Sequence, residues 1–213
     1  MPAATSPLAR CAQGALLIAA TAISALLWAQ HAPRFFLFTP DSYGTFWNRN
    51  GWMLLHVAGG TVPLFLGPLL LWSGLRRWPP RVHRWMGRTY LVTGALGVGA
   101  GAALALIAAS PPRSLYVATF TLALAWFIAA GMAYRAIRNR QVAAHRQWVI
   151  RSYVFTVTFV ICRIAMKLPI AQQGGEALTA IVWVSWIVPL LLAEAGIQWR
   201  GGAATRSSAG STP

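Results

Sequence analysis

The chain has 213 residues, of which 57% are hydrophobic and only 10% are charged. A soluble domain of this size carries about a quarter charged residues, so the composition excludes an ordinary soluble globular protein. The net charge of +15 comes from arginines that lie between long apolar runs rather than on an amphipathic surface, which argues against nucleic acid as a partner.

Apolar runs follow one another along the chain, each near the ~20 residues that a helix needs to cross a bilayer. They cover residues 14–30, 52–74, 89–109, 115–135, 150–168 and 178–198. We therefore predict an all-α, polytopic membrane helical bundle with about six transmembrane helices, forming a single integral membrane domain over residues 1–200. The tail 201–213 is rich in Gly, Ser, Ala and Thr, and this composition predicts a disordered cytoplasmic segment.

The basic residues alternate between the two sides of these runs. The N-terminal segment, the loops after the second and fourth runs and the C-terminal tail hold most of the arginines. The opposite loops hold Arg34, Arg49 and Arg113, together with the acids Asp41 and Glu176. The positive-inside rule then predicts a multi-pass protein of the bacterial cytoplasmic (inner) membrane, with both termini in the cytoplasm.

Two of the arginine-rich loops contain nearly the same phrase. HRWMGRTY covers residues 83–90, and HRQWVIRSY covers residues 145–153 and is one residue longer. We call these phrases the first and second box. Each box stands just before an apolar run, so runs two to five are predicted to form two related hairpins, which make a pseudo-repeated four-helix core. Pro79 and Pro80 can start a helix ahead of the first box, because proline is tolerated in a first helical turn.

Helical periodicity places the first box on a packing face. Gly residues at this spacing let a neighbouring helix approach closely, so the face is not expected to meet lipid. At 3.6 residues per turn the face contains His83, Gly87, Tyr90, Gly94, Gly97 and Gly101.

In the fifth run, His145, Ser152, Thr156 and Arg163 share one face. An arginine inside a span is costly unless it faces the bundle interior. His56, near the outer end of the second run, lies at a similar depth to Arg163. We predict an outer polar site made of His56, Arg163 and Lys167. Two interpretations stay open: a structural contact between helices, or a site for an anion, quinone or carboxylate ligand.

Several of these stretches occur together in one known family. They are His56-x-x-Gly59-Gly60, Gly67-Pro68, LRRWPPRVHRWMGRTY and AAHRQWVIRSY, with Arg163 downstream. In this combination residues 52–168 resemble bacterial predicted membrane proteins grouped as domain of unknown function 2306. Members often carry a Gln soon after the Gly-Pro, where this chain has Leu69 and Leu70. The resemblance implies the fold and a role for the three histidines and the arginine, and it implies no particular activity.

His83 and His145 are candidate axial ligands of a b-type haem, because both enter the membrane from the same side on different helices. Flanking arginines could then bind the propionates. A simpler interpretation gives both histidines hydrogen bonds to the ends of neighbouring helices. In that interpretation Trp and Tyr anchor the interface, Glu194 pairs with a cytoplasmic arginine, and lipid phosphates are bound by arginines. These arginines are Arg84, Arg88, Arg146 and Arg151.

Other activities are disfavoured by the sequence. It contains no G-x-S-x-G, H-E-x-x-H or P-loop motif, and Cys11 and Cys162 are too isolated for a metal site. Spans two to five hold no Asp or Glu that could carry protons. We therefore expect a redox-linked membrane subunit that uses haem b or a quinone. The alternative is a non-enzymatic small-solute or lipid-interacting membrane protein. The lipid bilayer is the expected partner, and a homo-oligomer or a redox partner stays open.

Overall fold

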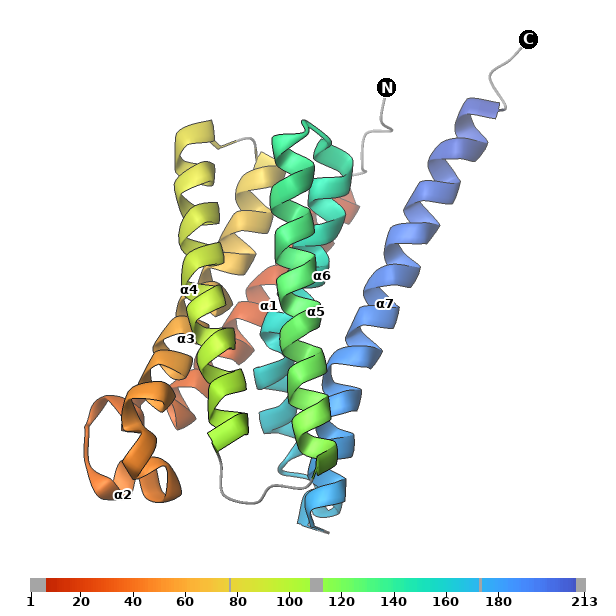
Figure 1. The fold of residues 1–213 in the computed structure, drawn as a ribbon. Coiled ribbons are helices and arrows are strands. Elements are labelled where there is room, and N and C mark those ends of the chain that lie inside the picture. Colours follow the sequence, from red (N-terminus) through yellow and green to blue (C-terminus); the bar gives the residue numbers. More distant parts are fainter. Residues whose placement is uncertain (1–6, 77, 108–112, 173, 210–213) are drawn as a thin grey trace.

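The structure, a computed structural model, describes residues 7–76, 78–107, 113–172 and 174–209, and no strand occurs among them. Long helices run side by side in one bundle (Figure 1). They are α1 (Pro7–His31), α3 (Asn50–Arg76), α4 (Pro80–Ile107), α5 (Arg113–Arg138), α6 (Val142–Ala165) and α7 (Gly175–Ala209). Short helical turns join them at one end: η1 (Pro33–Phe36), α2 (Pro40–Tyr43), η2 (Gly44–Arg49) and η3 (Pro169–Gln172). The predicted all-α bundle is confirmed.

Most of the long helices have the length and apolar composition of membrane spans. Among the described residues, α3 to α7 supply five such helices, whereas the apolar stretch found in α1, Leu17–His31, is shorter. Large apolar side chains such as Leu96, Leu124 and Leu191 are exposed on the outside of the bundle. Water would disfavour such a surface and lipid chains would not, so the bundle has the architecture of a polytopic membrane protein.

Two helices start earlier than the apolar runs suggest. Helix α4 begins at Pro80 and α6 at Val142, so both boxes are helical. Hydropathy misses these turns because they are rich in arginine, which is nevertheless a good helix former. Helix α7 continues to Ala209, into the segment whose composition predicts disorder; residues 210–213 of that segment lie outside the described residues. Helix α7 can extend into this segment because adding a residue to an existing helix costs less free energy than starting a new helix.

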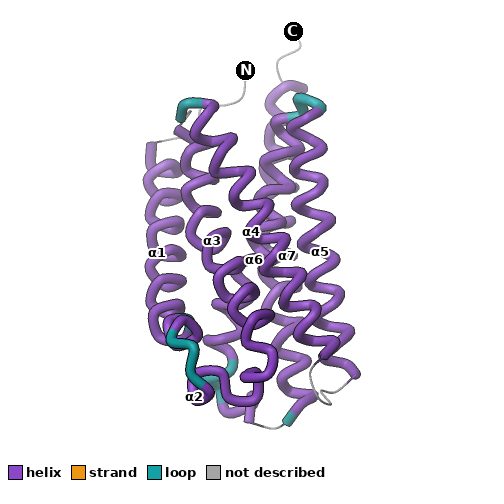
Figure 2. The backbone as a smooth tube through the Cα atoms, turned by 60° about the vertical axis from the view of Figure 1, so that its left-hand side comes forward, coloured by secondary structure: helices purple, strands orange, loops and turns teal. Residues whose placement is uncertain are grey.

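The core is a ring of four helices built from two hairpins. Helices α3 and α4 pack together along their length, as do α5 and α6, while α4 also packs on α5 and α3 on α6. This arrangement leaves α4 and α6 facing each other across the ring. Helix α1 lies beside α3 (Figure 2) and also contacts α6, and α7 lies against α5 and α6.

The two ends of the bundle differ in what they carry. The α3–α4 and α5–α6 turns lie at the upper end in Figure 1, with the start of α1 and the end of α7, whereas α2 lies at the lower end. We call the upper end, which carries both boxes, the inner end, and the lower end the outer end. The names follow the predicted orientation in the membrane.

Helices α3 and α4 touch through glycine. A Cβ atom on Gly59 would lie 2.6 Å from the backbone nitrogen of Gly97, and one on Gly97 would lie 2.6 Å from the carbonyl carbon of Gly59. One turn away, Gly94 makes room for the Trp126 ring of α5. The predicted packing face of α4 is therefore confirmed, since larger residues would push its neighbours away.

Candidate functional site

His83 of the first box binds the helix that precedes it. Its Nδ1 atom lies 2.7 Å from the hydroxyl of Ser73 on α3, and that hydroxyl lies 2.9 Å from the carbonyl oxygen of Leu70. A carbonyl oxygen can only accept, so the Ser73 proton is directed to Leu70. His83 must then donate from Nδ1, which leaves its Nε2 atom with a free lone pair.

His145 of the second box makes the corresponding contact in the other hairpin. Its Nδ1 atom lies 2.9 Å from the carbonyl oxygen of Ala133 on α5. Since the carbonyl accepts, Nδ1 donates here too, and Nε2 again carries the lone pair. Each box histidine therefore ties the second helix of its hairpin to the first. This contact is the simpler role that the sequence offers for both histidines.

The tyrosine that ends each box reaches the other hairpin. The Tyr90 hydroxyl on α4 lies 3.2 Å from that of Ser152 and 3.0 Å from that of Thr156, both on α6. The Tyr153 hydroxyl on α6 donates to the carbonyl oxygen of Leu64 on α3 at 3.3 Å. The repeated box thus performs two tasks twice, because its histidine closes one hairpin and its tyrosine joins the two hairpins.

The tryptophan and arginine of each box also pair with each other. Arg88 lies over the Trp85 ring at 5.8 Å, and Arg151 lies over the Trp148 ring at 4.7 Å. Such cation–π contacts hold the guanidinium group near the helix surface. The spacing of three residues between the rings and the arginines is the same in both boxes.

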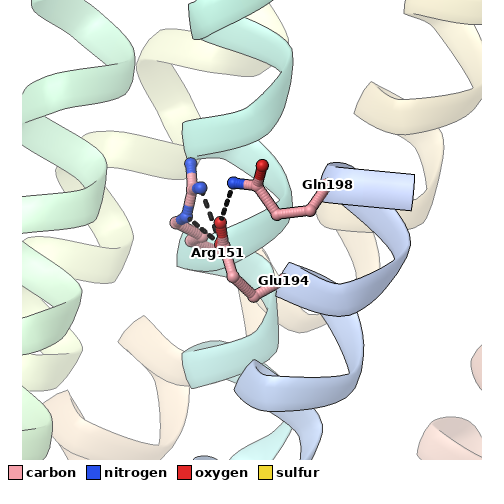
Figure 3. A network of polar contacts seen from close by, with 3 residues as sticks. All are labelled: Arg151, Glu194 and Gln198. Atoms are coloured by element: carbon pink, nitrogen blue, oxygen red, sulfur yellow. Dashed lines mark hydrogen bonds and ion pairs between the residues drawn. The ribbon is translucent and has the colours of Figure 1, made fainter. Parts of the chain in front are cut away.

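Arg151 has a further partner that connects α7 to the core. Its Nε and Nη2 atoms donate to one carboxylate oxygen of Glu194 at 3.0 and 2.7 Å, and Gln198 donates to the other oxygen at 2.9 Å (Figure 3). The pairing expected for Glu194 is thus formed. Arg151 stands among the predicted phosphate-binding arginines, but in the structure it faces a carboxylate. The other three, Arg84, Arg88 and Arg146, are exposed at the inner end.

Packing around His83 is looser than in the middle of α4. A Cβ atom on Gly74 would meet His83 at 3.8 Å, and one on Gly87 would meet Leu70 at 4.0 Å, which are ordinary contact distances. His83 and His145 lie close enough to affect each other electrostatically, yet they share no hydrogen bond. The structure therefore places the two predicted haem ligands in the first turns of two facing helices, at the inner end of the bundle.

At the outer end, His56 forms its hydrogen bond with α4. Its Nδ1 atom lies 2.8 Å from the carbonyl oxygen of Gly97, and a Cβ atom on Gly101 would lie 2.7 Å from it. The imidazole thus fills the space that the absent side chain of Gly101 leaves. Arg163 is near enough to act on His56 electrostatically but forms no hydrogen bond with it in the described structure.

Arg163 itself is half-buried near the end of α6. Its guanidinium group lies over the Phe159 ring at 5.2 Å. Lys167, beyond the end of α6, is exposed, and its ammonium group lies 3.5 Å from the side-chain oxygen of Gln30 on α1. The described residues form one ion pair, between Arg151 and Glu194, so no carboxylate of the described chain is paired with Arg163.

Some functional contacts have only a weak signal in the sequence. Periodicity places Ser152 and Thr156 on an interior face, but it does not indicate that the Trp126 indole donates to Thr156 at 3.0 Å. Ser73, which is only 1% exposed, is also missed. The available signal is a single hydroxyl residue within an apolar run, ten positions before a histidine.

One comparison with known proteins gives a match. A family model described as "Predicted membrane protein (DUF2306)" matches residues 53–197. The match extends beyond the four-helix core into α7, and it includes Glu194 as well as both boxes. No curated protein and no solved structure matches the chain.

Proposed function

The chain belongs to the DUF2306 family of predicted membrane proteins, and from this premise we propose that it is a redox-linked membrane subunit that holds a b-type haem between His83 and His145. One observation carries the proposal. Both imidazoles donate from Nδ1 to a neighbouring helix and keep the Nε2 lone pair. Histidines that bind metals are typically oriented in this way, by a hydrogen bond from the other ring nitrogen.

The surroundings of the two histidines suit such a group. Helices α4 and α6 face each other across the ring, and both histidines lie in the first turns of these helices. A Cβ atom on Gly74 would make only an ordinary contact with His83, and one on Gly87 only an ordinary contact with Leu70. The exposed guanidinium groups of Arg84, Arg88 and Arg146 are available for two propionates, since arginine binds carboxylates through paired hydrogen bonds. A haem bound there would supply one-electron chemistry.

The competing function is a non-enzymatic membrane protein that interacts with small solutes or lipids. In that case the histidine hydrogen bonds only hold the hairpins together. Of the surface hollows in the described structure, one lies near Phe120 and another near Phe155, where Arg151 and Glu194 also line it, and neither of these includes His83 or His145. A haem between the two histidines would need room that neither of these hollows supplies, whereas the competing function needs no room there.

An absorbance spectrum distinguishes the two functions. The protein is expressed with an adequate haem supply, purified in detergent and measured in the oxidised and the dithionite-reduced state. We expect a Soret band in the wild type, its loss in His83→Ala and in His145→Ala, and its retention in His31→Ala, a histidine at the outer end of α1. A wild type without a Soret band would contradict haem binding and favour the competing function.

A further inference from the structure

The outer end of the bundle gathers basic side chains from three parts of the chain. Arg34 lies in η1, His56 in α3 and Arg163 in the last turn of α6, and η1 packs on α3. Helix α1 packs on both α6 and η1, and the contact between Lys167 and Gln30 holds the outer ends of α1 and α6 together. In this arrangement the charge of Arg163 acts on Arg34 and on His56. Lys167 adds a further cation at the rim, where it contacts Gln30.

The position of Arg34 is fixed by its neighbour in sequence. Phe35 is buried, at 6% exposure, in a cluster with Tyr43, Met53 and Leu104. Its ring meets that of Tyr43 edge to face at 5.5 Å, and Arg34 lies over the Phe35 ring at 4.8 Å. The short helix η1 is thus anchored to α3 and α4, and its arginine is held at the outer end of the bundle.

No carboxylate of the described residues forms an ion pair with this cluster. The acids of the chain are Asp41, Glu176 and Glu194. Glu194 pairs with Arg151 at the inner end, and Glu176 accepts a hydrogen bond from Ser114 at 3.0 Å. Asp41 is exposed and forms no ion pair within the described residues. Two like charges near a membrane span are unfavourable unless an anion lies between them.

We propose that Arg34 and Arg163 bind an oxyanion, a phosphate or carboxylate group, at the outer end of the bundle. A guanidinium group matches both kinds of oxyanion with two parallel hydrogen bonds. The Phe159 ring holds Arg163 in place for this contact. His56 does not donate to the anion, because its Nδ1 proton is donated to Gly97 and neutral imidazole has no second proton to offer.

The oxyanion has two sources that the site itself does not distinguish. Arg163 lies two residues before the end of α6 at Ala165, which is ~3 Å along the helix axis. That depth is within reach of the phosphate of an outer-leaflet lipid, and also of a phosphate ion from the medium. The inference stands on Arg34 and Arg163 and is independent of haem binding at the inner end.

Thermal unfolding in nanodiscs tests the proposal and separates the sources. In one arm the nanodiscs contain phosphatidylcholine, and inorganic phosphate is compared with chloride at equal ionic strength. In the other arm phosphatidylglycerol replaces part of the phosphatidylcholine. We expect at least one arm to raise the melting temperature of the wild type on the order of 3 °C when the anion is about tenfold above its dissociation constant.

Variants show whether the rise comes from this site. Arg163→Gln and Arg34→Gln should each abolish it, and Arg49→Gln, which removes an arginine of η2, should keep it. If Arg163→Gln does not fold, Arg34→Gln carries the comparison alone, since Arg34 is exposed. A rise with phosphatidylglycerol alone assigns the site to a lipid, and a rise with inorganic phosphate assigns it to a free oxyanion. No rise in either arm, or the same rise in the Arg34 variant, would overturn the proposal.

Discussion

At the scale of single residues, the core depends on hydroxyl groups that bind one another. Tyr90 contacts Ser152 and Thr156, and Trp126 donates to Thr156. The Tyr90 and Trp126 rings also stack, with their centroids 6.2 Å apart. Buried polar groups need partners because no water replaces a missing hydrogen bond there. The network therefore sets which faces of α4, α5 and α6 meet.

Removing the Tyr90 hydroxyl measures what this network contributes. In Tyr90→Phe the ring stays, while Ser152 and Thr156 keep hydrogen bonds to carbonyl oxygens of their own helix. We expect the free energy of unfolding to fall by about 1 kcal/mol, as measured by denaturant unfolding in detergent. The control is Tyr134→Phe, whose ring is 51% exposed on α5. Equal stability of the two variants would show that the Tyr90 hydroxyl contributes nothing.

At the scale of helices, the distance between α3 and α4 is set by glycine. The backbones of Gly59 and Gly97 meet directly, and the carbonyl group of Gly97 also accepts the hydrogen bond from His56. Backbone atoms in contact cannot move aside as the end of a flexible side chain can. Close approach of this kind strengthens van der Waals contact, which is the main attraction between helices in lipid.

A single methyl group tests this contact. In Gly97→Ala the new Cβ atom would lie 2.6 Å from backbone atoms of α3, so the helices must separate and we expect a loss of about 1–3 kcal/mol. Gly99→Ala on the same helix is a matched control, because its Cβ atom would meet nothing within 4 Å. Alanine favours a helix over glycine, so the control should equal or exceed the wild type in melting temperature. A stable Gly97→Ala variant would contradict the close contact.

A charged contact adds to the apolar packing that holds helix α7 on the core. Arg151 and Glu194 form the one ion pair among the described residues, and Arg151 is only 15% exposed. Removing one partner of such a pair leaves the other without compensation, which costs more than the pair contributes. Glu194→Gln should therefore lower the melting temperature, and exchanging the two residues, Arg151→Glu with Glu194→Arg, should restore part of it. Failure of the exchange to restore stability would assign Glu194 another role.

At the scale of the whole molecule, the distribution of arginine defines two different ends. Both boxes lie at the end that also carries the start of α1 and the end of α7. The positive-inside rule predicts that this end faces the cytoplasm. The outer end carries η1, α2 and η2, whose aromatic residues suit the membrane–water interface.

Cysteine labelling in intact cells tests the orientation. In a background without native cysteines, Asp41→Cys should react with a membrane-impermeant thiol reagent. Asn139→Cys, in the α5–α6 turn, should react only after the cells are opened. Asp41 and Asn139 are both exposed in the structure, so a difference between them reports the side of the membrane. The opposite result would reverse the assignment of inner and outer ends.

The sequence by itself determined the class of fold and much of each helix. A spanning segment must satisfy its own backbone hydrogen bonds in lipid, so apolar runs of sufficient length become helices in almost any context. Proline at the start of α4 and the small residues along it likewise act locally, and the packing face of α4 follows from their spacing.

Which helix each face meets was decided only by the tertiary structure. Periodicity gives the direction of a side chain but not the element opposite it. His56 therefore donates to Gly97 on α4, and Arg151 pairs with Glu194 on α7. Such pairings depend on the order of helices around the ring, which is set by the summed packing of all the helices and not by any single segment.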